Sequence, residues 1–253
     1  MADAAIQPTG EETSWFRGPV RGEAVGKLGR VAAANLLRSH QTIPAVTHHD
    51  RAPVGALEEF RRSLRDEAEE RGTKLTGLAF HVKILARALE DFPLFNTALS
   101  ADGTTLWYRE YCDIGLAVDT PQGLLVPVIR DADRKGVWEI ASEILSLSAQ
   151  AREGRLPLTA MGQASMTISN LGGIGGRAFS PIVNPPEVAI LGITRSEVAP
   201  VWDGECFQPV EMVPLDLTYD HRVINGADAA RFLRHYCGLV EDPLSALTAA
   251  PAR

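Results

Sequence analysis

This sequence of 253 residues has few cysteines, no excess of positive charge and no long apolar run. The three cysteines, Cys112, Cys206 and Cys237, form no CxxC pair; this excludes a disulfide framework and a thiolate zinc site, so we interpret them as core or surface thiols. Lys and Arg total 25 against 32 Asp and Glu, without a basic tract, which argues against nucleic acid as a partner. No apolar run approaches the roughly 20 residues of a membrane-spanning helix, and residues 1–18 lack the apolar segment of a signal peptide. We therefore expect a cytoplasmic protein without a membrane partner.

The sequence does contain one continuous stretch that is able to form a core. Hydrophobic residues make up 45% of the chain, and no linker, repeat or low-complexity tract divides it after the first two dozen residues. Residues 1–24 hold Pro, Gly, Thr and charged residues without periodicity, so we interpret them as a flexible N-terminal arm. We expect one domain over residues 25–247, followed by a short C-terminal tail at residues 248–253.

Hydrophobic periodicity predicts four helices among short strands. The apolar stripes of the predicted helices cover residues 57–68, 78–89, 137–151 and 229–240. The predicted strands cover residues 43–48, 94–99, 105–108, 113–118, 124–129, 165–169, 188–193 and 210–219, with a hairpin turn at Asp203-Gly204. Because strands and helices do not alternate one to one, we expect an α/β (α+β) fold: a mixed sheet with helices on one face rather than a doubly wound nucleotide fold.

Two clusters imitate binding motifs without the structure that such motifs require. The glycine cluster at residues 172–176 mimics the GxGxxA spacing of a phosphate loop, but three prolines follow within ten residues and prevent the helix that a phosphate loop needs. We interpret it as a glycine turn after a strand. The run His48-His49-Asp50 offers two imidazoles and a carboxylate, but adjacent strand residues point to opposite faces, so we do not expect a metal site.

Two polar residues at strand ends are the candidates for chemistry. His221 lies between Asp220 and Arg222, where an alternating strand meets a turn and a helix; such junctions hold side chains rigidly yet within reach. A histidine there can act as a general base, or can complete turn hydrogen bonds beside a structural Asp–Arg pair. Ser169 ends a strand just before the glycine turn, where it can equally be a turn-capping serine. No GxSxG elbow surrounds it, which argues against a Ser-His-Asp hydrolase.

Five motifs occur in order along the chain. They are residues 43–48 (IPAVTH), 114–128 (IGLAVDTPQGLLVPV), 167–172 (TISNLG), 181–187 (PIVNPPE) and 220–226 (DHRVING). Together they resemble the catalytic domain of the dihydrolipoamide acyltransferase component of 2-oxoacid dehydrogenase complexes, closest to the pyruvate (acetyl) type. The resemblance implies a chloramphenicol-acetyltransferase-like fold and a homotrimer with active sites at subunit interfaces. It also implies a channel that coenzyme A enters at one end and dihydrolipoamide at the other.

The same resemblance assigns roles to three residues. His221 would be the general base that deprotonates the attacking thiol, and Ser169 would donate a hydrogen bond to the oxyanion, across the interface. Asn225 stands where many relatives have Asp and is assigned to organising the site. Transfer would be direct, with coenzyme A or acyl-CoA as substrate and without a metal. No lipoyl domain or peripheral subunit-binding domain accompanies the catalytic domain in this sequence, so we expect either an excised catalytic core or a stand-alone relative, with the lipoyl group supplied in trans.

Two alternatives to this function stay open at the level of sequence. The same His and Ser site can serve a stand-alone acyltransferase with a non-lipoyl small-molecule acceptor, or the chain can be a trimeric scaffold without catalysis. The tail at residues 248–253 is polar and small, unlike the short apolar tip with which relatives dock one trimer onto another. We therefore expect an isolated trimer rather than a larger core of several trimers.

Overall fold

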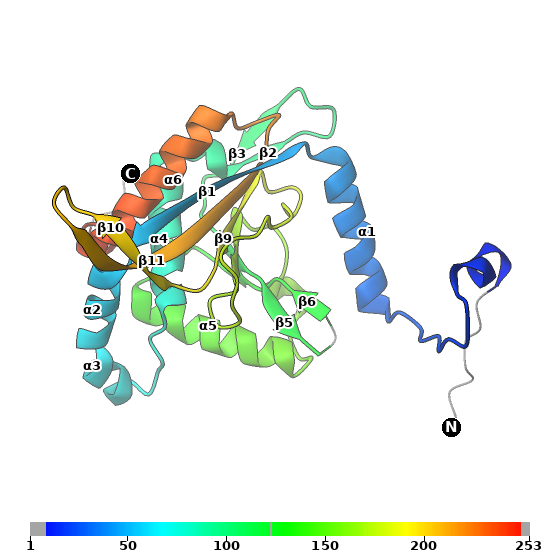
Figure 1. Ribbon diagram of the computed structural model, residues 1–253, viewed down its shortest axis with the longest axis horizontal. Coiled ribbons are helices and arrows are strands. Elements are labelled where there is room, and N and C mark those ends of the chain that lie inside the picture. The colour runs from blue at the N-terminus through cyan, green and yellow to red at the C-terminus, as the bar shows by residue number, and fades with distance from the viewer. Residues whose placement is uncertain (1–8, 122, 249–253) are drawn as a thin grey trace.

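The computed structural model describes residues 9–121 and 123–248, which form a mixed sheet with helices packed on one face (Figure 1). The strands are β1 (Ala45–Pro53), β2 (Thr97–Leu99), β3 (Leu106–Tyr108), β4 (Ile114–Leu116), β5 (Val118–Thr120), β6 (Gly123–Leu125), β7 (Val128–Ile129), β8 (Met166–Asn170), β9 (Ala189–Ile193), β10 (Glu197–Trp202) and β11 (Phe207–Asp220). The helices are η1 (Gly10–Trp15), α1 (Lys27–Thr42), α2 (Gly55–Ser63), α3 (Arg65–Glu70), α4 (Gly77–Asp91), η2 (Pro93–Asn96), α5 (Val137–Arg152), η3 (Leu158–Ala160), α6 (Gly226–Glu241) and α7 (Pro243–Thr248).

In the described part of the chain the main sheet has seven strands, in the order β1-β11-β9-β8-β4-β7, with β10 paired to the far end of β11. The pairs β9–β8 and β8–β4 are parallel and the others are antiparallel. The predicted mixed sheet is therefore confirmed. Two small hairpins, β2–β3 and β5–β6, lie outside the main sheet.

The helical face of the sheet carries the main core. Leu217, Leu191 and Ile168 stand side by side on β11, β9 and β8, and they are buried in one cluster with apolar residues of α4, α5 and α6. The opposite face has a much smaller buried cluster, Ile43 with Val183 and Ile190. The second face is covered mainly by the irregular segment between β8 and β9.

Three of the four predicted helices are confirmed as single helices: α4, α5 and α6. The first predicted stripe, which begins at Leu57, instead spans two helices, α2 and α3. They are separated by Leu64, whose backbone leaves the helical region at φ −92 and ψ 10. Leu57 and Ala68 are still buried and Leu64 packs against the core. The periodicity therefore identified the buried side chains correctly but not the break between the helices.

Several predicted strands are shorter or divided. Residues 94–99 begin as the 3-10 helix η2, because Pro93 starts the turn, and only Thr97–Leu99 is a strand. Residues 113–118 and 124–129 each split between the main sheet and the β5–β6 hairpin. The hairpin at Asp203-Gly204 is confirmed between β10 and β11, with Gly204 at φ +109.

Helix α1 (Lys27–Thr42) has no counterpart among the predicted helices. Among its described residues only Ser39 is buried, while Leu36 and Leu37 are 47% and 58% exposed. Figure 1 shows α1 standing apart from the helices that cover the sheet. Its apolar residues do recur on one side, as in the other helices, but this side is left largely uncovered within the chain. The three alanines at residues 32–34 are the signal that favours a helix here.

The two chain ends are described in part. Residues 9–24 of the predicted arm contain η1 (Gly10–Trp15), which lies away from the body and is joined to α1 by chain without regular structure (Figure 1); residues 1–8 lie outside the described residues. At the other end α7 (Pro243–Thr248) begins at a proline, and the rest of the predicted tail, residues 249–253, lies outside the described residues. The limits of arm, domain and tail stay predictions. None of the helices within residues 9–121 and 123–248 is long and apolar enough to cross a membrane.

Candidate active site

His221 is the first residue after β11, and its side chain is free. Its backbone N–H donates to the Pro44 carbonyl at 3.1 Å, which fixes the end of β11 to the start of β1. The imidazole lies 5.8 Å from the Tyr219 ring, centroid to centroid. It is exposed and makes no hydrogen bond to any residue that the structure describes. An unpaired imidazole on a fixed backbone is able to exchange a proton with a bound substrate.

The turn that carries His221 is held by its neighbours. The buried Asp220 accepts hydrogen bonds from the Arg222 guanidinium at 2.6 to 3.1 Å, so the predicted structural Asp–Arg pair is present. Asn225 caps helix α6: its Oδ1 accepts from the Asp228 N–H at 2.9 Å and its Nδ2 donates to the Asp228 carboxylate at 2.6 Å. Asn225 therefore contacts the start of α6 rather than the imidazole, and it orients the turn by capping this helix.

Ser169 lies near the end of β8 on the second face of the sheet, half-buried. It lines an apolar cavity of about 280 Å³ whose other walls come from α1 and from the segment between β8 and β9, including Phe179 and Asn184. The Ser169 hydroxyl has no hydrogen-bond partner among residues 9–121 and 123–248. The turn-capping role that its position also allows is therefore not what the structure shows. The hydroxyl is available to a ligand.

The strand register separates Ser169 from His221 within one chain. Ser169 pairs with Gly192, and Gly192 pairs with Asp216 on β11, while His221 lies five residues further along the chain. Two strand spacings across the sheet amount to roughly 10 Å, and five residues along β11 amount to roughly 16 Å. The Cα atoms of Ser169 and His221 therefore lie roughly 19 Å apart. The two side chains cannot both contact one reacting carbon in the same chain.

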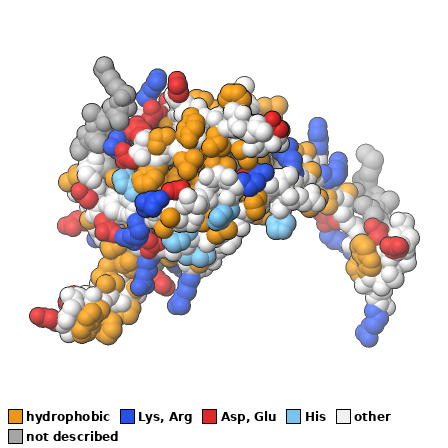
Figure 2. Space-filling view, turned by 90° about the horizontal axis from the view of Figure 1, so that it is seen from above, with side chains coloured by type: hydrophobic (Ala, Val, Ile, Leu, Met, Phe, Trp, Pro, Cys, Tyr) orange, Lys and Arg blue, Asp and Glu red, His pale blue; other side chains and the backbone are white. Residues whose placement is uncertain are grey.

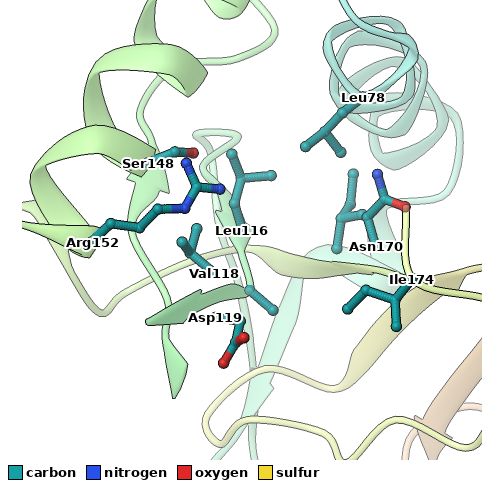
Figure 3. A pocket seen from close by; sticks show the side chains of 10 residues that line it. Leu78, Leu116, Val118, Asp119, Ser148, Arg152, Asn170 and Ile174 are labelled. Carbon is teal, nitrogen blue, oxygen red and sulfur yellow. The ribbon is translucent and has the colours of Figure 1, made fainter. Parts of the chain in front are cut away.

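A second, polar hollow lies beside the end of β8. Two adjoining cavities of about 380 and 630 Å³ share Leu78, Ser148, Arg152 and Asn170 as lining residues. Figure 3 shows Arg152 reaching from α5 toward Leu116, with Asn170 on the opposite wall. The larger cavity also takes in the backbone at Gly172-Gly173 and the start of α4.

Three basic side chains line the larger cavity without a carboxylate partner. Lys74, Arg152 and Arg195 make no ion pair with any described residue. Of the carboxylates on the same cavity, Glu58 is bonded to Arg61 at 2.7 Å, and Glu211 is exposed. In a chain of net charge −7, unpaired cations around one hollow favour an anionic ligand. Sequence reasoning missed them because they come from three separate segments.

A buried histidine also borders this hollow. His81 on α4 lines the larger cavity, and its Nδ1 lies 2.7 Å from the Tyr236 hydroxyl. Burial lowers the pKa of His81 to about 4, so the ring is neutral at physiological pH. It packs as a stacked partner of Tyr236, with 6.1 Å between ring centroids. It therefore adds no positive charge to the three cations.

The two clusters that imitate binding motifs lack the geometry of a metal site and of a helix-linked phosphate loop in the described residues. His49 and His48 fall on opposite faces: the His49 Nδ1 contacts the buried Asp216 at 2.6 Å, and His48 pairs in register with the core residue Leu217. Within the described ranges, no three His, Cys, Asp or Glu side chains are placed to hold a metal ion. The glycine cluster is a turn without a following helix, and Gly175 and Gly176 both have positive φ. All three cysteines are free, with Cys206 exposed.

Gly192 is the residue of β9 on which the Ser169 cavity depends, because the Phe179 ring lies directly on its backbone. A Cβ there would lie 2.7 and 2.9 Å from Phe179 ring atoms and 3.1 Å from the Asp216 Cβ. We expect Gly192→Ala to push the ring into the cavity and to lower the free energy of unfolding by about 1 to 3 kcal/mol. Chemical denaturation measures this. In the control, Gly238→Ala meets nothing within 4 Å inside α6 and should stabilise by about 0.5 to 1 kcal/mol; equal effects at both positions would contradict the packing argument.

The surface of the body carries charges of both signs. Figure 2 shows acidic and basic side chains interspersed over the face seen from above, with apolar side chains gathered near its centre. This face has no continuous basic area of the kind that binds nucleic acid. The unpaired cations of the polar hollow are thus a local feature.

The mixed sheet with a single helical layer is a chloramphenicol-acetyltransferase-like fold. The solved structure of chloramphenicol acetyltransferase shares the fold, with a TM-score of 0.50 at 13% identity, over 85% of this chain and 94% of that chain. Residues 19–248 match the family of 2-oxoacid dehydrogenases acyltransferase (catalytic domain). The chain belongs to this family, so the predicted fold and family are confirmed.

Relatives with known names agree with this assignment. The dihydrolipoyllysine-residue acetyltransferase component of the pyruvate dehydrogenase complex of Pseudomonas aeruginosa is 48% identical over 94% of this chain and 44% of its own length. That of Azotobacter vinelandii is 49% identical over 85% of this chain and 34% of its own length. The solved structure of the Azotobacter vinelandii dihydrolipoamide acetyltransferase has a TM-score of 0.92 at 45% identity, covering 96% of this chain and all of that one. The chain thus spans less than half the length of these two full relatives.

Proposed function

We propose that this domain moves an acyl group, acetyl for preference, directly between coenzyme A and a dihydrolipoyl thiol. The observation that carries the proposal is the unpaired His221 imidazole on its rigid turn. A thiol with a pKa near 8.5 is mostly protonated at neutral pH, so a base that takes its proton creates the nucleophile. The thiolate then attacks the acyl thioester carbon, and the negative charge moves to the carbonyl oxygen. Collapse of this oxyanion expels the second thiolate, which recovers the proton from His221.

Ser169 supplies the second part of this chemistry. Its unpaired hydroxyl is able to donate a hydrogen bond to the oxyanion. The Azotobacter vinelandii structure was solved to investigate the role of a serine, a histidine and an asparagine in the catalytic mechanism of that enzyme. The three residues there have the same spacing as Ser169, His221 and Asn225 here: fifty-two residues and then four. This match supports the assignment of all three to one site, with Asn225 orienting the turn.

The separation of roughly 19 Å between Ser169 and His221 supports a site shared by two copies of the chain. The protruding α1, whose Leu36 and Leu37 are exposed, offers a surface for such an assembly (Figure 1). We propose a homotrimer, in which His221 of one copy meets Ser169 of the next. The solved cubic core of a pyruvate dehydrogenase multienzyme complex is similar to this chain at a TM-score of 0.92 and 45% identity.

The cation-lined hollow is our proposed place for the phosphates of coenzyme A. Lys74, Arg152 and Arg195 supply charge there, and phosphates bind such unpaired cations strongly. We expect Arg195→Ala and Arg152→Ala each to raise the KM for acetyl-CoA by about tenfold with kcat nearly unchanged, because the lost contact is made in ground state and transition state alike. Arg51→Ala, at an exposed arginine of β1 outside the cavity, is the control. A KM for acetyl-CoA equal to that of the control would contradict this placement.

The activity itself is tested by acetyl transfer between acetyl-CoA and free dihydrolipoamide. We expect turnover without added metal, with the lipoyl group supplied in trans; cytoplasmic location stays a prediction from the sequence. The relatives' names do not favour a non-lipoyl acceptor or a scaffold. Turnover of another nucleophile together with failure of dihydrolipoamide would contradict the proposed acceptor. No transfer to any acceptor at high enzyme concentration would contradict an active enzyme.

A further inference from the structure

Glu187 is a buried carboxyl that the chemistry above does not use. It is 3% exposed, and its Oε1 accepts two hydrogen bonds, from the Thr167 hydroxyl at 2.9 Å and from the Asn184 amide at 3.1 Å. Its Oε2 is also buried and has no partner among the described residues. A buried carboxyl is costly unless its hydrogen bonds compensate. The two bonds of Oε1 are therefore the interactions that define its role.

Both hydrogen bonds connect Glu187 to residues that line the same cavity as Ser169. Thr167 lies two residues before Ser169 on β8, so their side chains share one face of the sheet. Thr167, Ser169 and Asn184 all line the apolar cavity of about 280 Å³. Asn184 belongs to the segment between β8 and β9 that forms the opposite wall. Glu187 thus connects the strand of Ser169 with the wall facing it.

The Thr167 hydroxyl also packs against the neighbouring strand β4. A Cβ added to Gly115 on β4 would lie only 2.5 Å from the Thr167 Oγ1, so the hydroxyl packs directly against the neighbouring backbone. It has Glu187 on one side and β4 on the other. The position of this part of β8 therefore depends on the carboxyl.

The charge of Glu187 does not decide this connection. Burial raises the pKa of Glu187 to about 7, while the hydrogen bonds from Thr167 and Asn184 and the nearby Arg109 act in the opposite direction. Arg109 donates to the Pro186 carbonyl at 3.3 Å. In either protonation state Oε1 is able to accept both hydrogen bonds. A glutamine in the same place keeps an oxygen acceptor and is the conservative replacement.

We propose that Glu187 is a positioning residue for acyl transfer, which holds Ser169 in place by bonding Thr167 on the same strand and Asn184 in the facing wall. The inference rests on the proposed function, because it concerns the hydroxyl that would meet the oxyanion. It assigns no direct contact between Glu187 and substrate. A small displacement of a transition-state donor is enough to slow the reaction, so the effect belongs to kcat.

The test uses two variants that remove the hydrogen bond between Thr167 and Glu187, one by replacing its acceptor and the other by replacing its donor. Glu187→Met keeps the length of the side chain without an acceptor, and Thr167→Val keeps the shape without the hydroxyl. We expect each to lower kcat by roughly 10- to 100-fold with the KM for acetyl-CoA nearly unchanged. The double variant should be no slower than the slower single variant, because both remove one interaction. Glu187→Gln should stay within about threefold of the parent chain, since its Oε1 still accepts from Thr167.

Repeating the substitutions in a Ser169→Ala background separates positioning from general damage. With the hydroxyl gone, Glu187→Met and Thr167→Val should change kcat no further.

The control is Asp113→Asn: Asp113 is a buried carboxyl bonded to Arg130 at 2.8 Å, so its loss should lower the melting temperature without lowering kcat. If Glu187→Met does not fold, Thr167→Val alone carries the test. Unchanged kcat in the folded single variants, or equal slowing with and without Ser169, would overturn the inference. The proposed function fails separately, if Ser169→Ala itself leaves kcat intact.

Discussion

His221→Ala should lower acetyl transfer between acetyl-CoA and dihydrolipoamide by at least about 100-fold and up to about 10,000-fold at neutral pH, the range expected for loss of a general base. The reason is that the attacking thiol would then lose its proton only to water. The imidazole makes no hydrogen bond to a described residue, and the turn is fixed through backbone groups and Asp220. The variant should therefore keep its fold. Steady-state kinetics with a sedimentation measurement of the assembly check both statements.

A histidine outside the site provides the matched control. The His235 Nε2 lies 3.0 Å from Asp91 on the surface of the helical layer, so His235→Ala should leave kcat unchanged. Raising the pH should recover part of the lost activity of His221→Ala, because more of the thiol is then ionised without a base. Full activity of His221→Ala at neutral pH would remove the histidine from the mechanism.

Ser169→Ala should reduce kcat by about 100- to 1,000-fold, the usual cost of losing one oxyanion donor. Because the Ser169 hydroxyl has no partner within the described residues, its removal should change the free energy of unfolding by no more than about 0.5 kcal/mol. The KM for acetyl-CoA should change little, since the lost bond forms in the transition state.

Ser165→Ala is the control for the Ser169→Ala result, because it removes a serine hydroxyl with a structural role beside the same strand, β8. The Ser165 hydroxyl accepts from the Asp113 N–H at 3.1 Å, so its removal should lower stability by about 1 to 3 kcal/mol and leave kcat intact. A large loss of stability in Ser169→Ala, or kcat losses of the same size in both variants, would count against the oxyanion role.

Local patterns predicted the elements that carry the chemistry. Alternation along β11 and the helix after Gly226 placed His221 at a strand–turn–helix junction, and the structure has that junction. The mixed sheet also followed from the irregular order of strands and helices. Helix α1 was missed although its apolar residues recur on one side. That side buries almost nothing within the chain, so it is not part of the core that the other helices share.

The arrangement of the site in space was beyond the reach of local patterns. The distance between Ser169 and His221 depends on which strands are neighbours and in what register, and both are long-range properties. The three unpaired cations come together from the loop before α4, the end of α5 and the segment after β9. Glu187 ends the motif at residues 181–187, but local patterns gave it no role, since a glutamate after two prolines suggests a solvent-exposed loop. Its burial depends on the packing of three separate strands and a loop.

The central claim is that one active site needs His221 from one chain and Ser169 from another, and mixed assemblies test it directly. Chains carrying His221→Ala and chains carrying Ser169→Ala, with different affinity tags, are co-expressed and purified through both tags. In a trimer that contains both chains, one of the three interfaces has both residues intact, so the account predicts about a third of the parent activity. Activity no higher than that of the Ser169→Ala chains alone would show that both residues act within a single chain, and would contradict the account.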